Sequence, residues 1–215
     1  MEKHFIRAKS QENKQIRMNE IMKATENLFS THTYHDISLT TIANELNMTR
    51  GNLYKYVHSK EEIFLQIYLN KQKEVIDTMV AKLQEISNLS TTSLAHTMTD
   101  ILETRLDYIQ YHQILNAIIE TNVSIEKLAD FKIQTFHGNA PLYQIIKETC
   151  HLDTLEQATH LYLTILYHCC YLYDRVAYHD TYTQAMKLVN LPIIPIDFNQ
   201  SLYQFIIMCL SHYYE

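Results

Sequence analysis

The sequence predicts an all-α fold in which a small front domain precedes a larger helical body. The chain of 215 residues has only 2 glycines and 3 prolines, whereas hairpins and sheets need many such turn residues. Apolar residues recur at helical spacing through most of the chain. Capping residues stand before several of these apolar segments. Long helices joined by short polar connections account for all three observations.

Composition also limits the function. With 47% hydrophobic and 20% charged residues the chain can build a core. The net charge of −6 argues against bulk coating of nucleic acid. The charge is uneven, however: residues 1–60 carry nine Lys and Arg against six Asp and Glu, and the rest carry nine against eighteen. Any contact with a polyanion therefore belongs to the front.

The front domain begins with residues 1–10, which have no clear periodicity and are expected to form a mobile arm. A first helix is predicted from about Gln11 to Ser30. Ser38 is a suitable cap for a short second helix, 39–46. Asn47 tolerates the left-handed conformation that ends a helix.

A third helix is expected from Arg50 to about Val57, capped by Thr49. Ser59 and Glu62 have the spacing of a capping box at the start of a long helix that runs from Lys60 into the eighties. A connection follows near residues 88–92. The remaining expected helices cover residues 93–110, 112–122, 125–149, with a break or kink at Gly138–Pro141, 155–178 and 199–214.

Two short helices joined by a tight turn make a helix-turn-helix, whose second helix enters the major groove of DNA. Arg50 and Lys55 suit guanine acceptors or phosphates. Asn52 suits adenine, and Tyr54 and Tyr56 suit phosphates or thymine methyl groups.

The neighbouring residues complete this interpretation. Gly51 removes a side chain, so the backbone can approach DNA closely. Lys60 lies in a helical first turn, where free amides and the helix dipole favour a phosphate. Leu53 and Val57 are expected to point into the small core. The predicted DNA-binding residues are Thr49, Arg50, Gly51, Asn52, Tyr54, Lys55, Tyr56 and Lys60.

At these residues the sequence resembles the DNA-binding domain of the TetR family of transcriptional regulators. The resemblance covers roughly residues 14–64, although Thr33 and Asn47 stand where members often have glycine, and Val57 where an aromatic residue is usual. It is carried by Leu28-Phe29, Ile42-Ala43, Thr49-Arg50-Gly51-Asn52-Leu53-Tyr54, Tyr56, Ser59-Lys60-Glu61-Glu62 and Ile63.

The resemblance implies an all-helical homodimer whose variable C-terminal domain binds a small molecule, and that binding alters the spacing of the two DNA-reading heads. We expect a DNA-binding domain over residues 1–62 and a ligand-binding and dimerisation domain over residues 63–215. The implied partners are a double-stranded DNA operator, a small-molecule effector and a second copy of the chain.

The body is rich in tyrosine and histidine, with 16 and 12 in the whole chain. Tyrosine joins an apolar ring to a polar tip, which suits a pocket for a flat or amphipathic molecule. We expect a cavity between the helices at 93–122 and 155–178, and the alternative is that these side chains only pack the core. The predicted ligand-binding residues are Tyr108, Tyr111, His112, Glu120, Tyr143, Tyr167, His168 and Tyr171.

Two carboxylates, Glu120 and Asp174, lie in strongly apolar segments and need a partner if buried. Arg105 or Arg175 is the expected structural partner, and a cationic ligand is the functional alternative. No third ligand accompanies the Glu156 and His160 pair at a suitable spacing, so no metal site is predicted.

The helix at 155–178 is apolar on two faces, one of which we expect to serve the body's core and the other a twin subunit. Complete burial within one chain is the alternative. The two faces consist of Leu161, Ile165 and Leu172, and of Tyr162, Leu166, Cys169 and Tyr173.

No catalytic motif and no cofactor-binding loop is found, so no catalytic residue is assigned. The four cysteines have no disulfide framework, and no leader or membrane-spanning segment is found, so a cytoplasmic protein is expected. Together the sequence predicts a ligand-responsive transcriptional repressor released from its operator by a small molecule. The alternative is a helical ligand-binding or enzymatic protein whose N-terminal domain no longer reads DNA.

Overall fold

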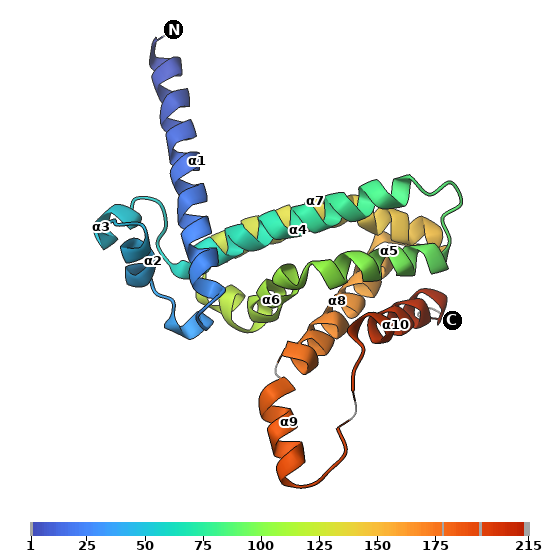
Figure 1. The fold of residues 1–215 in the computed structure, drawn as a ribbon. Helices are drawn as coiled ribbons and strands as arrows, with labels where there is room; N and C mark the ends of the chain where they lie inside the picture. Colours follow the sequence, from blue (N-terminus) through green and yellow to red (C-terminus); the bar gives the residue numbers. More distant parts are fainter. Residues whose placement is uncertain (1, 178, 194, 213–215) are drawn as a thin grey trace. The chain divides into compact units, whose positions relative to one another are not determined.

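The computed structural model describes residues 2–177, 179–193 and 195–212. Within these ranges every regular element is a helix and none is a strand (Figure 1), which confirms the all-α prediction. None of the helices in the described parts of the chain is long and apolar enough to span a membrane.

The chain forms two compact units, and each is described on its own. The front unit comprises the residues through Asn70 together with Leu115–Lys132, and the body unit comprises Lys71–Ile114 together with the residues from Ile133 onward. The division between them lies within a helix, α4 (Lys60–Gln84). The segment Leu115–Lys132 joins the front unit although it is distant in sequence.

The front unit is built on α1 (Glu2–Phe29), α2 (Leu39–Glu45), α3 (Arg50–Leu53) and the beginning of α4. The first helix begins earlier than the predicted Gln11, because α1 already starts at Glu2 and includes most of the expected arm. Aromatic rings pack against one another in the core of this unit. The Phe64 ring meets those of Phe29 and Tyr34 edge-on, each with a centroid separation of 5.2 Å.

Several expected caps are present. The Ser38 side chain accepts a hydrogen bond from the Thr41 amide, and Asn47 has φ = 52°. At the start of α4 the Ser59 hydroxyl accepts from the Glu62 amide at 3.3 Å. The Glu62 carboxylate accepts from the amide of His58, at 3.4 Å, so this second bond closes one residue earlier than the expected capping box.

The part of the chain after α4 differs from its expected helices at three places. The segment 93–110 divides into α5 (Thr91–Thr104) and α6 (Leu106–Ile114). The segment 112–122 is not an α-helix, since a π-helical turn (Leu115–Ile119) and a 3₁₀ turn (Glu120–Asn122) follow α6. The remaining helices are α7 (Ile125–Thr149), α8 (Leu155–Ala177), the unexpected α9 (His179–Leu188) and α10 (Phe198–His212). The ends that we expected at residues 178 and 214 lie outside the described residues.

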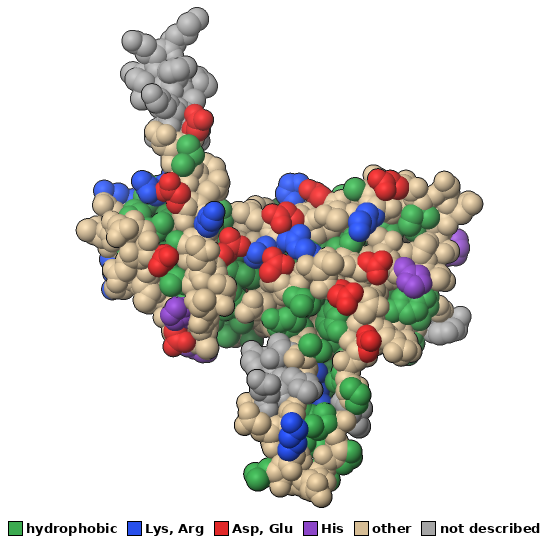
Figure 2. Space-filling view, in the orientation of Figure 1, with side chains coloured by type: hydrophobic (Ala, Val, Ile, Leu, Met, Phe, Trp, Pro, Cys, Tyr) green, Lys and Arg blue, Asp and Glu red, His purple; other side chains and the backbone are tan. Residues whose placement is uncertain are grey.

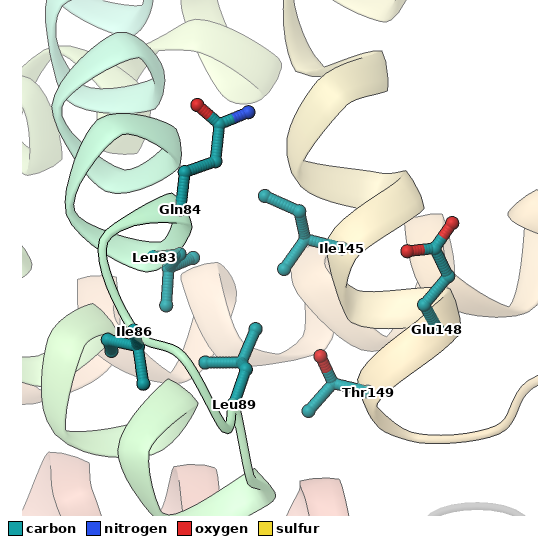
Figure 3. Close-up of a pocket in the computed structure, with 7 residues that line it drawn as sticks. All are labelled: Leu83, Gln84, Ile86, Leu89, Ile145, Glu148 and Thr149. Carbon is teal, nitrogen blue, oxygen red and sulfur yellow. The ribbon is translucent and has the colours of Figure 1, made fainter.

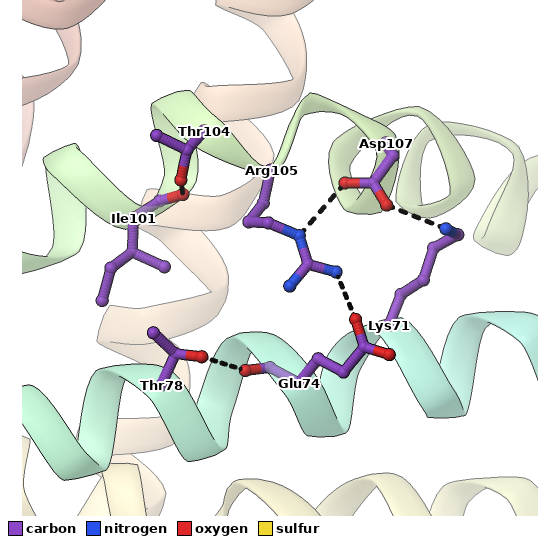
Figure 4. Close-up of polar contacts among 7 residues, drawn as sticks. All are labelled: Lys71, Glu74, Thr78, Ile101, Thr104, Arg105 and Asp107. Atoms are coloured by element: carbon purple, nitrogen blue, oxygen red, sulfur yellow. Dashed lines mark hydrogen bonds and ion pairs between the residues drawn. The ribbon is translucent and has the colours of Figure 1, made fainter.

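Arg105 explains the division between α5 and α6. Its backbone has φ = −120° and ψ = 46°, which is not helical. Its guanidinium donates to Asp107 at 3.2 Å and to Glu74 of α4 at 2.8 Å (Figure 4). Lys71 of α4 also donates to Asp107, at 2.8 Å. These charged contacts connect the α5–α6 junction to α4.

The expected break at Gly138–Pro141 is absent, because α7 continues through Pro141. A proline inside a helix removes one backbone hydrogen bond and leaves the carbonyl four residues earlier without its donor. Both Pro141 and His137, four residues before it, are exposed. Water can therefore satisfy that carbonyl, and the helix continues.

The core of the body lies where α10 packs against α5 and α8. Rings strengthen both contacts: His96 stacks on Tyr203 with centroids 4.3 Å apart, and His168 stacks on Phe205 at 3.7 Å. The fully or nearly fully buried side chains there are Leu94, Met98, Leu102, Leu161, Ile165, Leu202 and Ile206.

Candidate nucleic-acid interface

The helix-turn-helix is formed by α2, a tight turn and α3. The turn needs one left-handed residue, Asn47, and the Met48 amide then donates to the Ala43 carbonyl at 2.8 Å. Thr49 is the N-cap of α3, and its hydroxyl accepts from the Asn52 amide at 3.3 Å. Short-range hydrogen bonds therefore fix the angle at which α3 leaves α2.

The expected third helix is shorter than predicted, since α3 ends at Leu53 and the next three residues form a turn. Leu53 and Val57 are 0% and 2% exposed. This confirms that they point into the small core. They hold the first turn of α3 against the rest of the unit.

The opposite side of α3 is an exposed polar surface. The Arg50 guanidinium donates to the Tyr54 hydroxyl from Nη2 at 2.6 Å and from Nε at 3.2 Å. Lys55 donates to the side-chain oxygen of Asn52 at 2.9 Å. Figure 2 shows Lys and Arg side chains gathered at the edge of the molecule where α2 and α3 lie. Two cations, an amide and a phenol thus share one surface, while Tyr56 behind them is half-buried.

Gly51 lies on this surface and has an ordinary negative φ. No atom of the described chain lies within 4 Å of the position that a Cβ would take. Neither backbone strain nor internal crowding therefore calls for glycine at this position. A molecule that approaches α3 from solvent would therefore be the reason for a residue without a side chain at this position.

Lys60 has internal partners that the sequence did not predict. Its ammonium donates to the carbonyl oxygens of Tyr34 and Ile37, both at 2.7 Å, and lies 3.8 Å from the centroid of the Tyr34 ring. Burial lowers the pKa of Lys60, while the carboxylates of Glu61 and Asp36 oppose that shift. The ammonium holds the loop that leads into α2.

Two of the predicted ligand-binding tyrosines are core residues of the body. Tyr108 is 0% exposed and its hydroxyl lies 3.5 Å from that of Tyr162, while Tyr143 packs its ring 5.8 Å from the Tyr162 ring. Asn139 donates to the Tyr143 hydroxyl at 2.8 Å, and Gln72 of α4 donates to Asn139 at 2.5 Å. The structure therefore brings these tyrosines together as packed, hydrogen-bonded groups.

The other predicted ligand residues of the body are spread along α6 and α8. Tyr111 and His112 are buried on α6. The His112 ring lies 5.8 Å from that of Tyr167, which is 50% exposed. Tyr171 is 60% exposed, and His168 stacks against α10. Burial lowers the pKa of His168. A ligand role for these residues stays a prediction.

Glu120 has a partner other than the expected arginines, and Asp174 is exposed rather than buried. Glu120 belongs to the front unit and pairs with Lys132 at 2.7 Å. Arg105 pairs with Glu74 and Asp107 instead, and Arg175 lies 4.5 Å from the Tyr182 ring centroid. In the described residues no group of three or more His, Cys, Asp or Glu side chains is arranged to hold a metal ion.

The body unit has a cleft of about 340 Å³ away from the predicted tyrosines. It lies where α4 and α7 end (Figure 3). Sequence analysis missed it, and the available signal was the pair of apolar residues in the polar α4–α5 connection, Ile86 and Leu89. The residues that line the cleft are Leu83, Gln84, Ile86, Leu89, Ile145, Glu148 and Thr149.

Comparison with known proteins agrees with this geometry. A family model described as "Bacterial regulatory proteins, tetR family" matches residues 21–67, and one described as "Tetracyclin repressor-like, C-terminal domain" matches residues 69–211. No protein with a curated description is significantly similar to the chain.

Solved structures of low sequence identity share the fold. A TetR/AcrR-family regulator from Thermobifida fusca is 18% identical with a TM-score of 0.56, over 93% of this chain and 99% of that one. The fatty acid degradation regulator FadR from Bacillus halodurans is 13% identical with a TM-score of 0.57, over 92% and 96%. A TetR-family regulator from Marinobacter aquaeolei is 15% identical with a TM-score of 0.53, over 94% and 97%. Since the two family models together match most of the chain, this protein belongs to the TetR family of bacterial transcriptional regulators.

Proposed function

We propose that this regulator is a repressor that reads its operator with α3 and leaves it when a small molecule binds the body. The observation that carries the proposal is the exposed surface of α3. There the side chains of Arg50, Asn52, Tyr54 and Lys55 project from a turn of helix anchored by buried Leu53. Guanidinium and amide groups recognise base edges in the major groove, and ammonium and phenol groups suit phosphates.

Thr49, Gly51 and Tyr56 have supporting roles in this proposal. Thr49 caps α3 and so sets its direction. The open space around Gly51 leaves room for a DNA backbone. Tyr56 is half-buried beside the surface, a position that suits a phosphate contact. For Lys60 we propose phosphate binding by the helix start, while its ammonium orients the loop before α2.

We further propose that the functional form is a homodimer. Both predicted apolar faces of α8 are buried within the single chain, except for half-buried Tyr173, so neither can be the dimer face as first expected. Other apolar side chains of these helices are exposed, namely Tyr167 and Tyr171 of α8 and Met208 of α10, and we propose that they contribute to the dimer surface. Analytical ultracentrifugation tests this proposal, and a monomeric Tyr171→Asp variant is expected. A wild-type protein that stays monomeric would contradict it.

A dimer would explain how a ligand could regulate binding. Two successive major-groove faces lie about 34–36 Å apart. A modest change in the spacing of two heads would therefore prevent one of them from docking. The repressor would act in the cytoplasm, where bacterial DNA lies, and the proposal assigns no catalytic residue to the chain.

The DNA-reading surface is tested with a duplex that the wild-type protein selects from a random pool. The double variant Arg50→Ala, Lys55→Ala should bind this duplex about a hundredfold or more weakly, since each specific contact contributes about 1–3 kcal/mol. A gel shift measures the change. The matched control is Lys82→Ala, Lys127→Ala, which removes the same charge from exposed positions elsewhere.

The control variant should bind within about twofold of wild type, and both variants should keep the wild-type circular dichroism spectrum. Equal affinity in the test variant and the wild type would contradict the role of α3. The alternative, a helical protein that no longer reads DNA, predicts no steep salt dependence of duplex binding. Thr33 and Val57, the two departures from the family pattern that suggested this alternative, both fit the structure. The Thr33 hydroxyl donates to the Asp36 carboxylate at 2.6 Å, and Val57 is buried.

A further inference from the structure

The exposed side chains of α3 and of the turn after it are joined in pairs. The turn continues the path of the helix, since the Tyr54 amide donates to the Arg50 carbonyl at 3.1 Å and the Lys55 amide donates to the Asn52 carbonyl at 3.3 Å. Residues three or four positions apart therefore share one side of this segment. The side-chain bonds from Arg50 to Tyr54 and from Lys55 to Asn52 follow from that spacing.

The bond between Lys55 and Asn52 fixes the orientation of the side-chain amide. An ammonium group can only donate hydrogen bonds. The Asn52 atom that lies 2.9 Å from the Lys55 nitrogen therefore has to be the oxygen, Oδ1. The amide nitrogen, Nδ2, makes no hydrogen bond to another described residue, and Asn52 is exposed. Its two hydrogens are thus available to DNA.

The ammonium beside Oδ1 disfavours two of the four bases. Asparagine binds adenine by accepting from the N6 amino group while it donates to N7. At Asn52 the amino hydrogens of adenine, or those of cytosine, would have to approach the positive charge of Lys55. They would also compete with a charge-assisted hydrogen bond, which is roughly twice as strong as a neutral one. Guanine presents two acceptors in the major groove, O6 and N7, and so suits the Nδ2 donor beside the ammonium.

Arg50 presents donors of the same kind. Its Nε and Nη2 atoms donate to the Tyr54 hydroxyl at 3.2 Å and 2.6 Å, which uses one edge of the guanidinium. The outer edge keeps the hydrogens of Nη1 and the second hydrogen of Nη2, and two such parallel donors pair with O6 and N7 of guanine. Residues 46–60 contain no Asp or Glu, so no carboxylate of this segment could accept from adenine or cytosine.

We propose that α3 selects guanine, and that Lys55 is a positioning residue that gives Asn52 a preference for guanine over adenine. The sequence alone favoured adenine for Asn52, because it does not show which end of the amide is occupied. The inference rests on the proposed function and names the base that this surface selects. Lys55 keeps two further hydrogens, so it can hold Asn52 and still contact a phosphate.

The first experiment locates the base that Asn52 contacts. The wild-type protein selects a duplex from a random pool, and gel shifts measure its affinity for that duplex with each base pair changed in turn. Asn52→Ala should lose sensitivity at one base pair, which identifies the pair that Asn52 contacts. In the wild-type protein this pair should be G·C, and A·T in its place should weaken binding about tenfold.

A modified base tests whether the major-groove edge is recognised. Hypoxanthine keeps O6 and N7 but lacks the amino group that guanine presents in the minor groove. A duplex with hypoxanthine at this position should therefore bind within about twofold of the guanine duplex. A tenfold loss with hypoxanthine would place the recognition in the minor groove and overturn the proposal.

Substitutions of Lys55 test its positioning role. In Lys55→Met the ratio of affinities for guanine and adenine at this pair should move about tenfold toward adenine, because Oδ1 becomes available to N6. Lys55→Arg keeps a charged donor and should retain the preference for guanine. The matched control is Lys23→Met, which removes the same charge from an exposed position of α1 and should leave the base preference unchanged.

The possible failures of the inference and of the proposed function can be told apart. A pair other than G·C at the Asn52 position, or a wild-type preference for guanine in Lys55→Met, would overturn the inference alone. An Asn52→Ala variant that stays sensitive at every base pair would do the same. Failure to select any duplex would contradict the proposed function and the inference with it. All the substituted side chains are exposed, and circular dichroism would verify that the variants fold.

Discussion

The two compact units use polar side chains in different ways. In the front unit the side chains that cap the helices of the helix-turn-helix accept hydrogen bonds from backbone amides three residues away, as at Ser38 and Thr49. In the body unit the characteristic contacts join two side chains far apart in sequence. Gln72 bonds to Asn139 across 67 positions, and Asn199 bonds to Glu103 across 96.

The two units therefore differ in what their polar side chains depend on: neighbouring residues in the front unit, and distant residues in the body unit. A cap is satisfied by the residues beside it, so the geometry of α3 depends little on the rest of the chain. A buried pair between distant helices is satisfied only while those helices keep their positions. The body is therefore the region in which one broken contact should have the largest effect on stability.

The largest expected effect is at Asn139. This residue is 2% exposed, accepts from Gln72 and donates to Tyr143. Asn139→Leu would leave the Tyr143 hydroxyl without this donor and the Gln72 amide without one of its two acceptors, since Gln72 also donates to the Thr135 carbonyl at 3.1 Å. A buried polar group that loses its partner costs about 1–3 kcal/mol. Urea unfolding followed by circular dichroism should show a loss of about 2–4 kcal/mol.

A matched exposed position supplies the control. Asn88→Leu, in the α4–α5 connection, should change the free energy of unfolding by less than about 0.5 kcal/mol. Adding Gln72→Met to Asn139→Leu should cost less than the sum of the two single changes, because the double variant no longer buries a Gln72 amide that has lost one of its two acceptors. Strict additivity of the two changes would mean that the pair does not couple α4 to α7.

A smaller effect is expected at Lys60 in the front unit. Lys60→Met would remove both hydrogen bonds to the carbonyls of Tyr34 and Ile37. The site is half-buried, and the loss should be about 1–2 kcal/mol. Hydrogen exchange of the amides at residues 34–37 measures it locally and should become faster.

Lys55→Met provides the contrast, because Lys55 is exposed and bonds only to Asn52 among the contacts resolved in the described chain. It should weaken duplex binding without changing exchange at residues 34–37. The salt dependence then distinguishes the two roles of Lys60. A salt slope reduced by about one in Lys60→Met would indicate a phosphate contact of its own, whereas an unchanged slope would indicate that Lys60 only orients the loop.

Local signals in the sequence were sufficient for the front unit's main features. Ser38, Asn47 and Thr49 adopt the expected roles because caps and left-handed turns depend on a few consecutive residues. The same reasoning missed the internal partners of Lys60, since the Tyr34 and Ile37 carbonyls lie 26 and 23 positions away.

The body could be predicted only in outline. Its long helices follow from periodicity, but the break at Arg105 depends on Glu74, 31 positions earlier. The functional meaning of the tyrosines could not be read from their number, because core packing and pocket lining use the same residue type. The cleft depends on where two distant helices end, and no single segment encodes that coincidence.

The smallest effect is expected at Asp107, where α6 contacts α4 through charged groups (Figure 4). Burial raises the pKa of Asp107, but hydrogen bonds and charge from Lys71 and Arg105 outweigh it and hold the pKa below its ordinary value. Since the pKa is lower in the folded state, the ionised carboxylate stabilises the fold above the unfolded pKa of about 3.9. That contribution is lost as the pH falls through the lower folded value.

Asp107→Asn should therefore lower the free energy of unfolding at neutral pH by only about 0.5–1 kcal/mol, because the carboxylate is 45% exposed. The difference from wild type should shrink as the pH approaches 3, where the wild-type carboxylate also becomes protonated. Asp77→Asn, which removes a more exposed partner of Lys73, should have almost no effect at any pH. If the free energy of unfolding of Asp107→Asn stayed equally far below the wild-type value in acid, packing rather than charge would hold α6 to α4. The body unit would then resemble the front unit more closely than its charged contacts suggest.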